Sequence, residues 1–580
     1  MADEHFQAVV VGSGFGGSVA ACRLAEGGMS VCVLERGKPY PPGSFARTPF
    51  ELHNNFWRPS SGTYGLFDIW SFSHMQAVVS AGVGGGSLIY ANVLLRKDEK
   101  WFVNDGKPGQ PHTPWPVSRA ELDPHYDVVE RMLGGTVYPT WYQNDNKTSA
   151  MREAARRMCI GETTHTSINP REPQFFLPLL AISFSPTKND PPGTPIPNSA
   201  NNIHRSARET CRLCGECDVG CNYGAKNTLD FTYLSAAKDF GAEIRQLCEV
   251  ETIAPLPGRC GFEILYVLHE PDSELHRKHI KRMTADRLIL GGGALGTTLL
   301  LLRNRNKFPA LKSSKVLGTR FSGNGDYLAF AVGCTDYTSD PNGVPWRLNA
   351  SRAPVITSTF RFPDCLDGGT EKGPGLYLQD AGYPLAGDYI WEAMSPLRVL
   401  FRVLLFAGRR FLRLLRGKPK TEIGGELGRL VGEGRMSSTS MPLLGMGRDV
   451  PDGVAKLQRN NRLDMKWSAA ASQPYYRRID RVARAVTNQL GGRYFADPLS
   501  VDLNSQITVH PLGGCPMGLN VDDGVVDSYG RVFGCCGLYV VDGAVMPGPV
   551  GPNPSLTIAA LAERFSLQIL DDWRSGRCAP

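Results

Sequence analysis

Four of the chain's 15 cysteines stand within the stretch CRLCGECDVGC. Their spacing, C-x2-C-x2-C-x3-C, is the one with which bacterial ferredoxins wrap an iron–sulfur cluster. Zinc sites more often divide their ligands between two distant pairs. Unliganded thiols are a third interpretation, because free cysteine buries like a small hydrophobe. The spacing favours an iron–sulfur cluster on Cys211, Cys214, Cys217 and Cys221, with zinc and bare thiols left as alternatives.

The first strand–turn–helix–strand pattern of the chain is typical of dinucleotide binding. An apolar run at Val9–Val11 predicts a strand, Gly12, Gly14 and Gly17 supply G-x-G-x-x-G, and a helix and a second strand ending at Glu35 follow. In this motif the first glycine permits a tight turn, the second lets a pyrophosphate approach, and the third lets helix and strand pack closely. A carboxylate at the position of Glu35 accepts hydrogen bonds from a ribose. The pattern predicts a Rossmann-like domain and does not choose between NAD and FAD.

Two further glycine-rich stretches are flanked by apolar residues, which favours backbone held against another surface over a loose loop. The first is AGVGGGS, with Gly82, Gly84, Gly85, Gly86 and Ser87. The second begins at Gly291, directly after a strand predicted at Leu288–Leu290. It predicts a second close backbone approach at a strand end of the same sheet.

The carboxyl-terminal part places His510 in ITVHPLGGCPMG and Asn553 just before a helix predicted from Ser555. These stretches, together with GSGFGG, GVGGGS, GAKNTLDFTYLSAA, LGTRFSGNGDY and MPLLGMGRDVPDG, resemble the glucose–methanol–choline (GMC) oxidoreductases, above all their cholesterol-oxidase-like branch. The resemblance implies that FAD is the cofactor, that His510 is the catalytic histidine and that Asn553 is its partner. Asn553 is also suited to cap the following helix, and the two roles are compatible.

The resemblance also implies the architecture and further contacts to FAD. We expect an α/β fold with a discontinuous FAD-binding domain made of residues 1–100, 205–335 and 500–580. A substrate-binding domain on an antiparallel sheet would combine residues 101–204 and 336–499. The resemblance places Val250, Asp542 and Gly543 beside the cofactor, in addition to the glycines and Glu35.

Residue types at the predicted site suit the oxidation of an alcohol. An imidazole near neutral pKa accepts the hydroxyl proton, and a neutral amide hydrogen-bonds the substrate oxygen without competing for that proton. We therefore predict FAD-dependent oxidation of an apolar alcohol, sterol-like, long-chain or secondary, to a carbonyl. Electrons would leave through the iron–sulfur cluster to an external acceptor, a protein or a quinone.

Three other functions compete with this one. The first is an oxygen-using sterol oxidase without a cluster, and the second is a lyase similar to the fatty-acid photodecarboxylases of the same family. The third is a pure electron-transfer protein, which His510 and Asn553 disfavour.

One departure from the cholesterol oxidases concerns steroid double-bond isomerisation. Those enzymes carry a glutamate on a substrate-domain loop for this step, and the matching region here reads QDAGYPLAGDYIW. Asp380 or Asp388 would have to replace that glutamate, and neither aligns cleanly. The sequence therefore does not support isomerase activity.

Composition and charge restrict location and partners. A net charge of +7 over 580 residues, without a nucleic-acid-binding motif, does not point to nucleic acid. Scattered cysteines favour a reducing compartment, and neither a signal peptide nor a spanning segment is expected.

The stretch 395–420 is amphipathic: five arginines fall within an arc of about 60° on a helix. These features predict a cytoplasmic protein with peripheral membrane contact through 395–420; a core-packed helix or a protein contact is the alternative.

Overall fold

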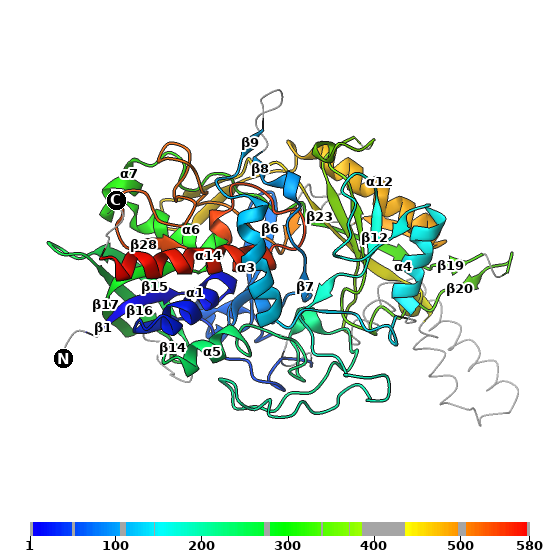
Figure 1. Ribbon diagram of the computed structural model, residues 1–580, viewed down its shortest axis with the longest axis horizontal. Helices are drawn as coiled ribbons and strands as arrows, with labels where there is room; N and C mark the ends of the chain where they lie inside the picture. Colours follow the sequence, from blue (N-terminus) through cyan, green and yellow to red (C-terminus); the bar gives the residue numbers. More distant parts are fainter. Residues whose placement is uncertain are drawn as a thin grey trace, which may run out of the picture.

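The computed structural model describes residues 4–48, 51, 53–104, 112–143, 146–271, 279–337, 340–370, 372–384, 435–496 and 506–576. These residues form two regions, each built around a large β-sheet, which lie at the left and right of Figure 1. The arginine-rich stretch 395–420 and Asp388 lie outside the described residues.

A mixed seven-stranded sheet organises the first region, and it is parallel at its centre. Its strands run in the order β14 (Glu243–Arg245), β2 (Val31–Leu34), β1 (His5–Val11), β17 (His279–Leu290), β16 (Phe262–Leu268) and β15 (Cys248–Pro255), with β28 (Leu538–Val540) also paired to β17. The middle of β1, Ala8 to Val10, is fully buried, as expected of a parallel strand covered on both faces. The predicted strands at the dinucleotide motif and before Gly291 are confirmed.

Helices cover this sheet. They are α1 (Phe15–Glu26), α3 (Arg119–Met132), α5 (Tyr233–Asp239), α6 (Gly293–Asn304), α7 (Pro309–Ser313) and α14 (Ser555–Arg574). α14 packs between α1 and α3, so the end of the chain lies against its beginning (Figure 1). The helix predicted from Ser555 is confirmed, and the fold class is confirmed with it.

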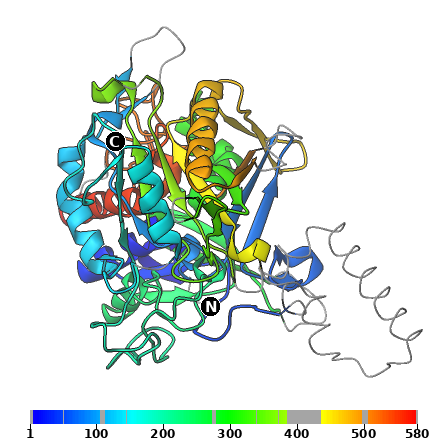
Figure 2. The ribbon, with the colours of Figure 1, turned by 90° about the vertical axis from the view of Figure 1, so that its right-hand side faces the viewer.

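A predominantly antiparallel sheet of seven strands organises the second region. Its order is β11 (Gly161–Glu162), β12 (Gln174–Phe176), β21 (Thr359–Phe362), β22 (Leu376–Asp380), β23 (Met441–Gly447), β18 (Tyr327–Val332) and β26 (Arg493–Ala496). Helices α4 (Asn146–Arg157) and α12 (Gln473–Gln489) share a hydrophobic core with it. Figure 2 brings α4 (cyan) and α12 (orange) to the front.

Shorter elements complete the fold. Two three-stranded sheets have the orders β10 (Thr136–Val137), β13 (Leu179–Leu180), β7 (Val93–Leu94) and β27 (Gln506–Thr508), β6 (Met75–Ser80), β5 (Phe67–Ser71). Four small hairpins pair β3 (Trp57–Arg58) with β4 (Thr63–Tyr64), β8 (Val103–Asn104) with β9 (Thr113–Pro114), β19 (Thr335–Asp336) with β20 (Val344–Pro345), and β24 (Val454–Leu457) with β25 (Leu463–Lys466). A single helical turn, α11 (Arg435–Ser438), precedes β23. The division of the chain into two domains at the expected residue numbers stays a prediction.

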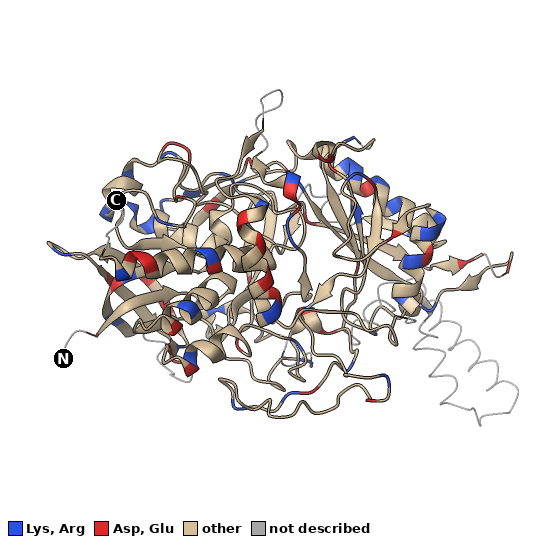
Figure 3. Cartoon of the chain, in the orientation of Figure 1, with Lys and Arg blue, Asp and Glu red and all other residues tan. Residues whose placement is uncertain are grey.

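The outer helices α3, α4 and α12 carry charged side chains of both signs, and basic ones predominate on α4 and α12 (Figure 3). None of the described helices combines the length and the hydropathy that a membrane-spanning segment needs.

Candidate functional site

The three glycine-rich stretches predicted from the sequence meet at one place. A Cβ on Gly12, whose φ is +92°, would lie 2.5 Å from the carbonyl oxygen of Gly291, and one on Gly17 would lie 2.0 Å from that of Gly12. A Cβ on Gly85 would lie 2.5 Å from the Cα of Gly14. Backbone therefore packs directly on backbone here, which only glycine permits. We call this set, Gly12, Gly14, Gly17, Gly82, Gly84, Gly85, Gly86 and Gly291, the glycine cradle.

Around the cradle, the first turn of α1 is open to an anion. Gly14 is the N-cap of α1 and provides no side-chain cap, so the first amides of the helix keep their donors. A Cβ on Gly14 would meet only one neighbouring atom, at 3.8 Å. An accessible helix N-terminus next to a glycine turn is what a pyrophosphate requires.

Glu35 follows β2 and is buried at the edge of the cradle. Its Oε2 accepts from the amide and the hydroxyl of Ser13, at 2.9 and 2.7 Å, and its Oε1 accepts from the amide of Gly37 at 2.8 Å. A carboxylate has about four acceptor sites, so Glu35 retains capacity for a ribose hydroxyl. Val250 lies on β15, whose first residue, Cys248, donates its amide to the Glu35 carbonyl at 2.8 Å. The predicted contact of Val250 with the cofactor stays a prediction.

Ser87 and Asp542 hold the cradle in place. Ser87 is fully buried, and its hydroxyl donates to the carbonyl of Gly84 at 2.7 Å. Asp542 follows β28 and accepts from the amide of Gly293 at 2.8 Å and from the Thr297 hydroxyl at 2.5 Å, which ties β28 to α6. Burial raises the pKa of Asp542 to about 6. Gly543 is buried directly beside it.

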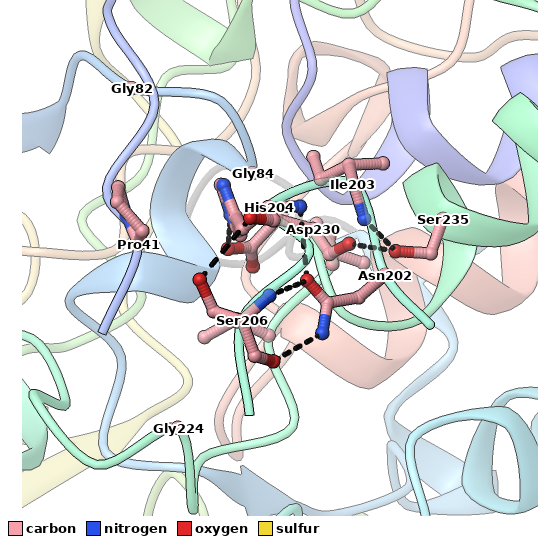
Figure 4. A network of polar contacts seen from close by, with 12 residues as sticks. Pro41, Gly82, Gly84, Asn202, Ile203, His204, Ser206, Gly224, Asp230 and Ser235 are labelled. Carbon is pink, nitrogen blue, oxygen red and sulfur yellow. Dashed lines mark hydrogen bonds and ion pairs between the residues drawn. The ribbon is translucent and has the colours of Figure 1, made fainter. Parts of the chain in front are cut away.

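A buried His204–Asp230 pair, which sequence reasoning missed, lies next to this cradle (Figure 4). His204 Nε2 and Asp230 Oδ2 are 2.7 Å apart, and Asn202 accepts the His204 amide at 2.9 Å. Asp230 Oδ1 has no hydrogen-bond partner among the described residues and lies 3.4 Å from where a Cβ of Gly84 would be. The only signal in the sequence was the place of Asp230 in GAKNTLDFTYLSAA.

Other buried polar atoms near the cradle fit a bound FAD. Asn92, four residues after the short 3-10 helix Gly85–Leu88, is fully buried, and neither its Nδ2 nor its Oδ1 has a partner among the described residues. Thr228 Oγ1 is likewise buried and has no hydrogen-bond partner among the described residues. An unsatisfied buried polar group costs about 1–3 kcal/mol, and a cofactor rich in donors and acceptors would satisfy these groups. The residues present therefore fit FAD.

His510 follows β27, and its ring is oriented by Asp326. His510 Nδ1 lies 2.6 Å from Asp326 Oδ1. Asp326 Oδ2 accepts from the Thr508 hydroxyl and from the amides of Val509 and His510, at 2.9, 2.8 and 3.1 Å. Since Nδ1–H donates a hydrogen bond to the Asp326 carboxylate, the neutral imidazole carries its lone pair on Nε2. No described residue binds Nε2, and the His510 side chain is 20% exposed.

Asn553 is held near the same turn of chain. It is 7% exposed and stands just before α14. Asn324 accepts the amide of Gly551 at 2.9 Å and donates to the Pro552 carbonyl at 3.0 Å. Asn324 and Asp326 are two residues apart, so one turn braces both the Asn553 loop and His510. Asn553 Oδ1 accepts from Gln379 Nε2 at 3.0 Å. We call His510, Asp326, Asn324, Asn553 and Gln379 the His510–Asn553 site.

Asp326, Asn324 and Gln379 were not singled out from the sequence. Asp326 and Asn324 lie in LGTRFSGNGDY, which was noted only for its resemblance. Asp449, in MPLLGMGRDVPDG, is buried behind this turn and accepts from the Ser322 hydroxyl at 2.5 Å and the Gly323 amide at 3.0 Å. Burial, with the charge of Asp326 adding to it, raises the pKa of Asp449 to about 7.

Asp380 does not face this site. It forms a buried ion pair with Lys147 of α4, at 2.9 Å, and also accepts from Thr357 and Ser358. With every acceptor engaged, Asp380 is suited to joining α4 to the second sheet, and it is not available as a base.

The four cysteines of the ferredoxin-like motif line a single pocket, together with Lys226. All four are free thiols, and burial raises the pKa of Cys214 to about 12. Within the described residues, no group of three or more His, Cys, Asp or Glu side chains is arranged to hold a metal ion. The iron–sulfur cluster and zinc are thus not supported by this arrangement. Lys226 donates to the carbonyls of Cys217 and Leu88, at 2.6 and 3.0 Å, and so links the cysteine loop to the cradle.

Comparison with known proteins confirms the predicted kinship. The GMC oxidoreductase C-terminal model matches residues 469–562, and a model of NAD(P)-binding Rossmann-like domains matches residues 10–46. A cholesterol oxidase of Mycobacterium tuberculosis is 29% identical over 96% of this chain and 90% of its own length. A cholesterol oxidase of Acinetobacter baumannii is 28% identical, with 96% and 93% covered.

Two further likenesses are more distant, one in sequence and one in fold. A long-chain-alcohol oxidase of Arabidopsis thaliana is 24% identical over 97% of this chain and 67% of its own length. The crystal structure of pyridoxine 4-oxidase from Mesorbium loti superimposes with a TM-score of 0.55 at 15% identity, covering 97% of this chain and 98% of that one. Together with the site, these findings define the class of the protein: it is an oxidoreductase related to the GMC enzymes and acting on CH–OH donors. FAD is supported as its cofactor.

Proposed function

We propose that this protein oxidises an apolar alcohol, sterol-like or long-chain, to a carbonyl compound. The observation that carries the proposal is the turn from Asn324 to Asp326, which braces His510 on one side and the Asn553 loop on the other. The names of the relatives, cholesterol oxidases and long-chain-alcohol oxidases, support an apolar substrate.

Each residue has a distinct part in the reaction. When bound in the cradle, FAD supplies the acceptor for the hydride that leaves the alcohol carbon. His510 Nε2 would accept the hydroxyl proton, and the Asp326 carboxylate would stabilise the resulting imidazolium through Nδ1. Asn553 would donate from Nδ2 to the substrate oxygen, where negative charge develops as the proton leaves. Glu35, Asp542, Gly543, Ser87 and the cradle would hold the cofactor.

A panel of alcohols tests this proposal. The purified holoprotein would be assayed with cholesterol, dodecan-1-ol and propan-2-ol, both by oxygen consumption and with a dye as acceptor, in darkness. We expect kcat/KM for cholesterol or dodecan-1-ol to exceed that for propan-2-ol by at least about 100-fold, since each buried methylene contributes about 0.8 kcal/mol. A flavin-loaded protein that oxidises none of the three would refute the proposal. Decarboxylation of a fatty acid only under light would favour the lyase instead.

A second candidate is a dehydrogenase that passes electrons to a cluster on Cys211, Cys214, Cys217 and Cys221. It rests on the ferredoxin-like spacing of these cysteines; the four thiols form no metal-ion group as folded, but all four line one pocket, which Lys226 joins to the cradle. Iron and acid-labile sulfide would be measured in protein purified without air, with the Cys214→Ser variant as control. Several irons per chain in the wild type and a marked loss in the variant would support the cluster. Less than one iron per chain in both would leave an oxygen-using oxidase.

Peripheral membrane contact through residues 395–420 remains a proposal from sequence alone, since this stretch lies outside the described residues. Arginines on one face of an amphipathic helix attract anionic headgroups, by about 1 kcal/mol each. Reversing the charge at Arg402, Arg409 and Arg413 should abolish sedimentation with liposomes that contain phosphatidylserine, and should spare turnover of propan-2-ol. Unchanged sedimentation would refute the contact.

A further inference from the structure

Gln379 is a buried side chain that reaches the predicted catalytic residues from the second sheet. It lies on β22, between β21 and β23, and is 0% exposed. Its neighbour Leu378 belongs to the core shared with α4 and α12, and Asp380 binds Lys147 of α4. Because side chains alternate along a strand, Gln379 points to the opposite face, where its Nε2 meets Asn553.

The hydrogen bond between these two amides has a direction. A side-chain amide accepts through its oxygen and donates through its nitrogen. Gln379 donates to Asn553 Oδ1, at 3.0 Å. The oxygen side of Asn553 is therefore engaged, and its Nδ2 faces away from Gln379. No described residue accepts from that Nδ2.

We propose that Gln379 is a positioning residue that holds the Asn553 amide with its Nδ2 toward the substrate oxygen. The inference rests on the proposed function, because it assigns Gln379 a part in the reaction given there to Asn553. If the side-chain amide of Asn553 were rotated by half a turn, its oxygen would face the developing negative charge on the substrate oxygen, and the interaction would change from attraction to repulsion.

Gln379 is well suited to this task because its side chain makes no hydrogen bond to any other described residue. Its Oε1 is buried and finds no hydrogen-bond partner among the described residues. A buried amide with one unsatisfied atom is costly unless a ligand or water meets it. Thr359, opposite Gln379 on β21, also has a buried hydroxyl that finds no hydrogen-bond partner among the described residues, Asn553 included. Thr359 therefore offers a matched control.

Gln379→Glu makes the role visible in a pH profile. A protonated carboxyl still donates to Asn553 Oδ1, whereas an ionised carboxylate only accepts and would draw Nδ2 to itself. Burial shifts a glutamate pKa upward from about 4.3, so the change should occur within the accessible pH range. With the alcohol that the wild type oxidises best, we expect the ratio of kcat in Gln379→Glu to kcat in the wild type to fall at least about 10-fold between pH 5 and pH 8.

Gln379→Met removes the donor without introducing a charge. Its kcat should be about 10-fold below that of the wild type at every pH, with KM changed less, because an interaction made mainly in the transition state is lost. Thr359→Val should match the wild type. Values of kcat within twofold of the wild type for both Gln379 variants, or a Glu-to-wild-type ratio that stays flat with pH, would overturn the proposal.

Asn553→Ala separates this proposal from the proposed function. If it retains full alcohol oxidation, the reaction does not use Asn553, and the role given to it above fails. If it loses activity while the Gln379 variants do not, only the positioning role fails.

A stability cycle tests the hydrogen bond without any turnover. If the two amides are paired, the decrease in Tm of the double variant Gln379→Met/Asn553→Ala should be smaller than the sum of the decreases in the two single variants. Strict additivity of the losses in Tm would show that the pair is absent and would also overturn the proposal.

Discussion

In the glycine cradle, backbone meets backbone, whereas in the His510–Asn553 site, side chains from separate segments meet through hydrogen bonds. Where its segments cross, the cradle allows no substitution, because a single methyl group at Gly17 or Gly85 would occupy the space of neighbouring backbone atoms. At the His510–Asn553 site the arrangement depends on which atom of each polar group faces its partner. The glycine cradle selects for the smallest residue, and the His510–Asn553 site selects for hydrogen-bonding direction.

The largest effect should come from the cradle. In Gly17→Ala the new Cβ would lie 2.0 Å from the Gly12 carbonyl oxygen, so α1 must move away from β1. We expect the variant to purify with less than about a tenth of the wild-type FAD per chain, measured by flavin absorbance, and with a lower Tm.

Gly296→Ala, on α6, is the matched control, because nothing lies within 4 Å of its Cβ. It should retain FAD and a wild-type Tm. Equal flavin content in both variants would contradict the description of the cradle.

His510→Ala should reduce turnover while leaving the cradle intact. General-base catalysis contributes about 100- to 10,000-fold, so kcat for alcohol oxidation should fall by that range. Flavin absorbance and Tm should stay at wild-type values, since the side chain is 20% exposed and its partner Asp326 keeps its hydrogen bonds from Thr508 and Val509. A variant with FAD and full activity would remove His510 from the reaction.

Asp326→Asn tests whether His510 needs its carboxylate partner or only a hydrogen bond. The single amide oxygen can face either Nδ1 or the three donors that Oδ2 now serves, from Thr508, Val509 and His510, and the amide cannot stabilise an imidazolium by charge. We expect kcat to fall about 100-fold, with flavin content unchanged. Retention of more than half the wild-type kcat would show that orientation alone suffices.

The smallest effect concerns the pH dependence of stability through Asp449. Its pKa, raised to about 7 by burial, exceeds that of the unfolded chain, about 3.9. The folded state thus binds the proton more tightly, and the stability associated with it is fully present below about pH 4 and is lost as the pH rises to about 7.

The side chain in Asp449→Asn cannot ionise, so the Tm of this variant should decrease less between pH 5 and pH 8 than the Tm of the wild type. The difference should be about 2 °C, measured by thermal unfolding at both pH values. An identical loss of Tm in the two proteins would mean that Asp449 does not titrate in this range.

Much of the cradle could be predicted from sequence, because its motifs are local. Gly12, Gly14 and Gly17 read as a turn between a strand and a helix, and β1, α1 and β2 are found there. The FAD-related stretches around Gly82 and Gly291 were recognised in the same way. By contrast, Asp326, Asn324 and Gln379 carried no signal of their own, since their roles depend on partners 184, 227 and 174 residues away.

The cysteine motif shows the reverse case. Its spacing predicted a cluster, yet the thiols as folded do not form a metal-ion group among the described residues. Asp380 was considered as a base from its position in the sequence, and its burial against Lys147 decided otherwise.

By itself, the sequence determined the dinucleotide fold, because glycine turns and strand–helix alternation follow from local stereochemistry. Its resemblance to the GMC oxidoreductases indicated the class of the protein and His510 and Asn553 as candidates. Only the tertiary structure decided which polar groups surround those two residues and which way their amides and imidazole face. Hydrogen-bond direction depends on atoms brought together by folding, and no spacing along the chain encodes it.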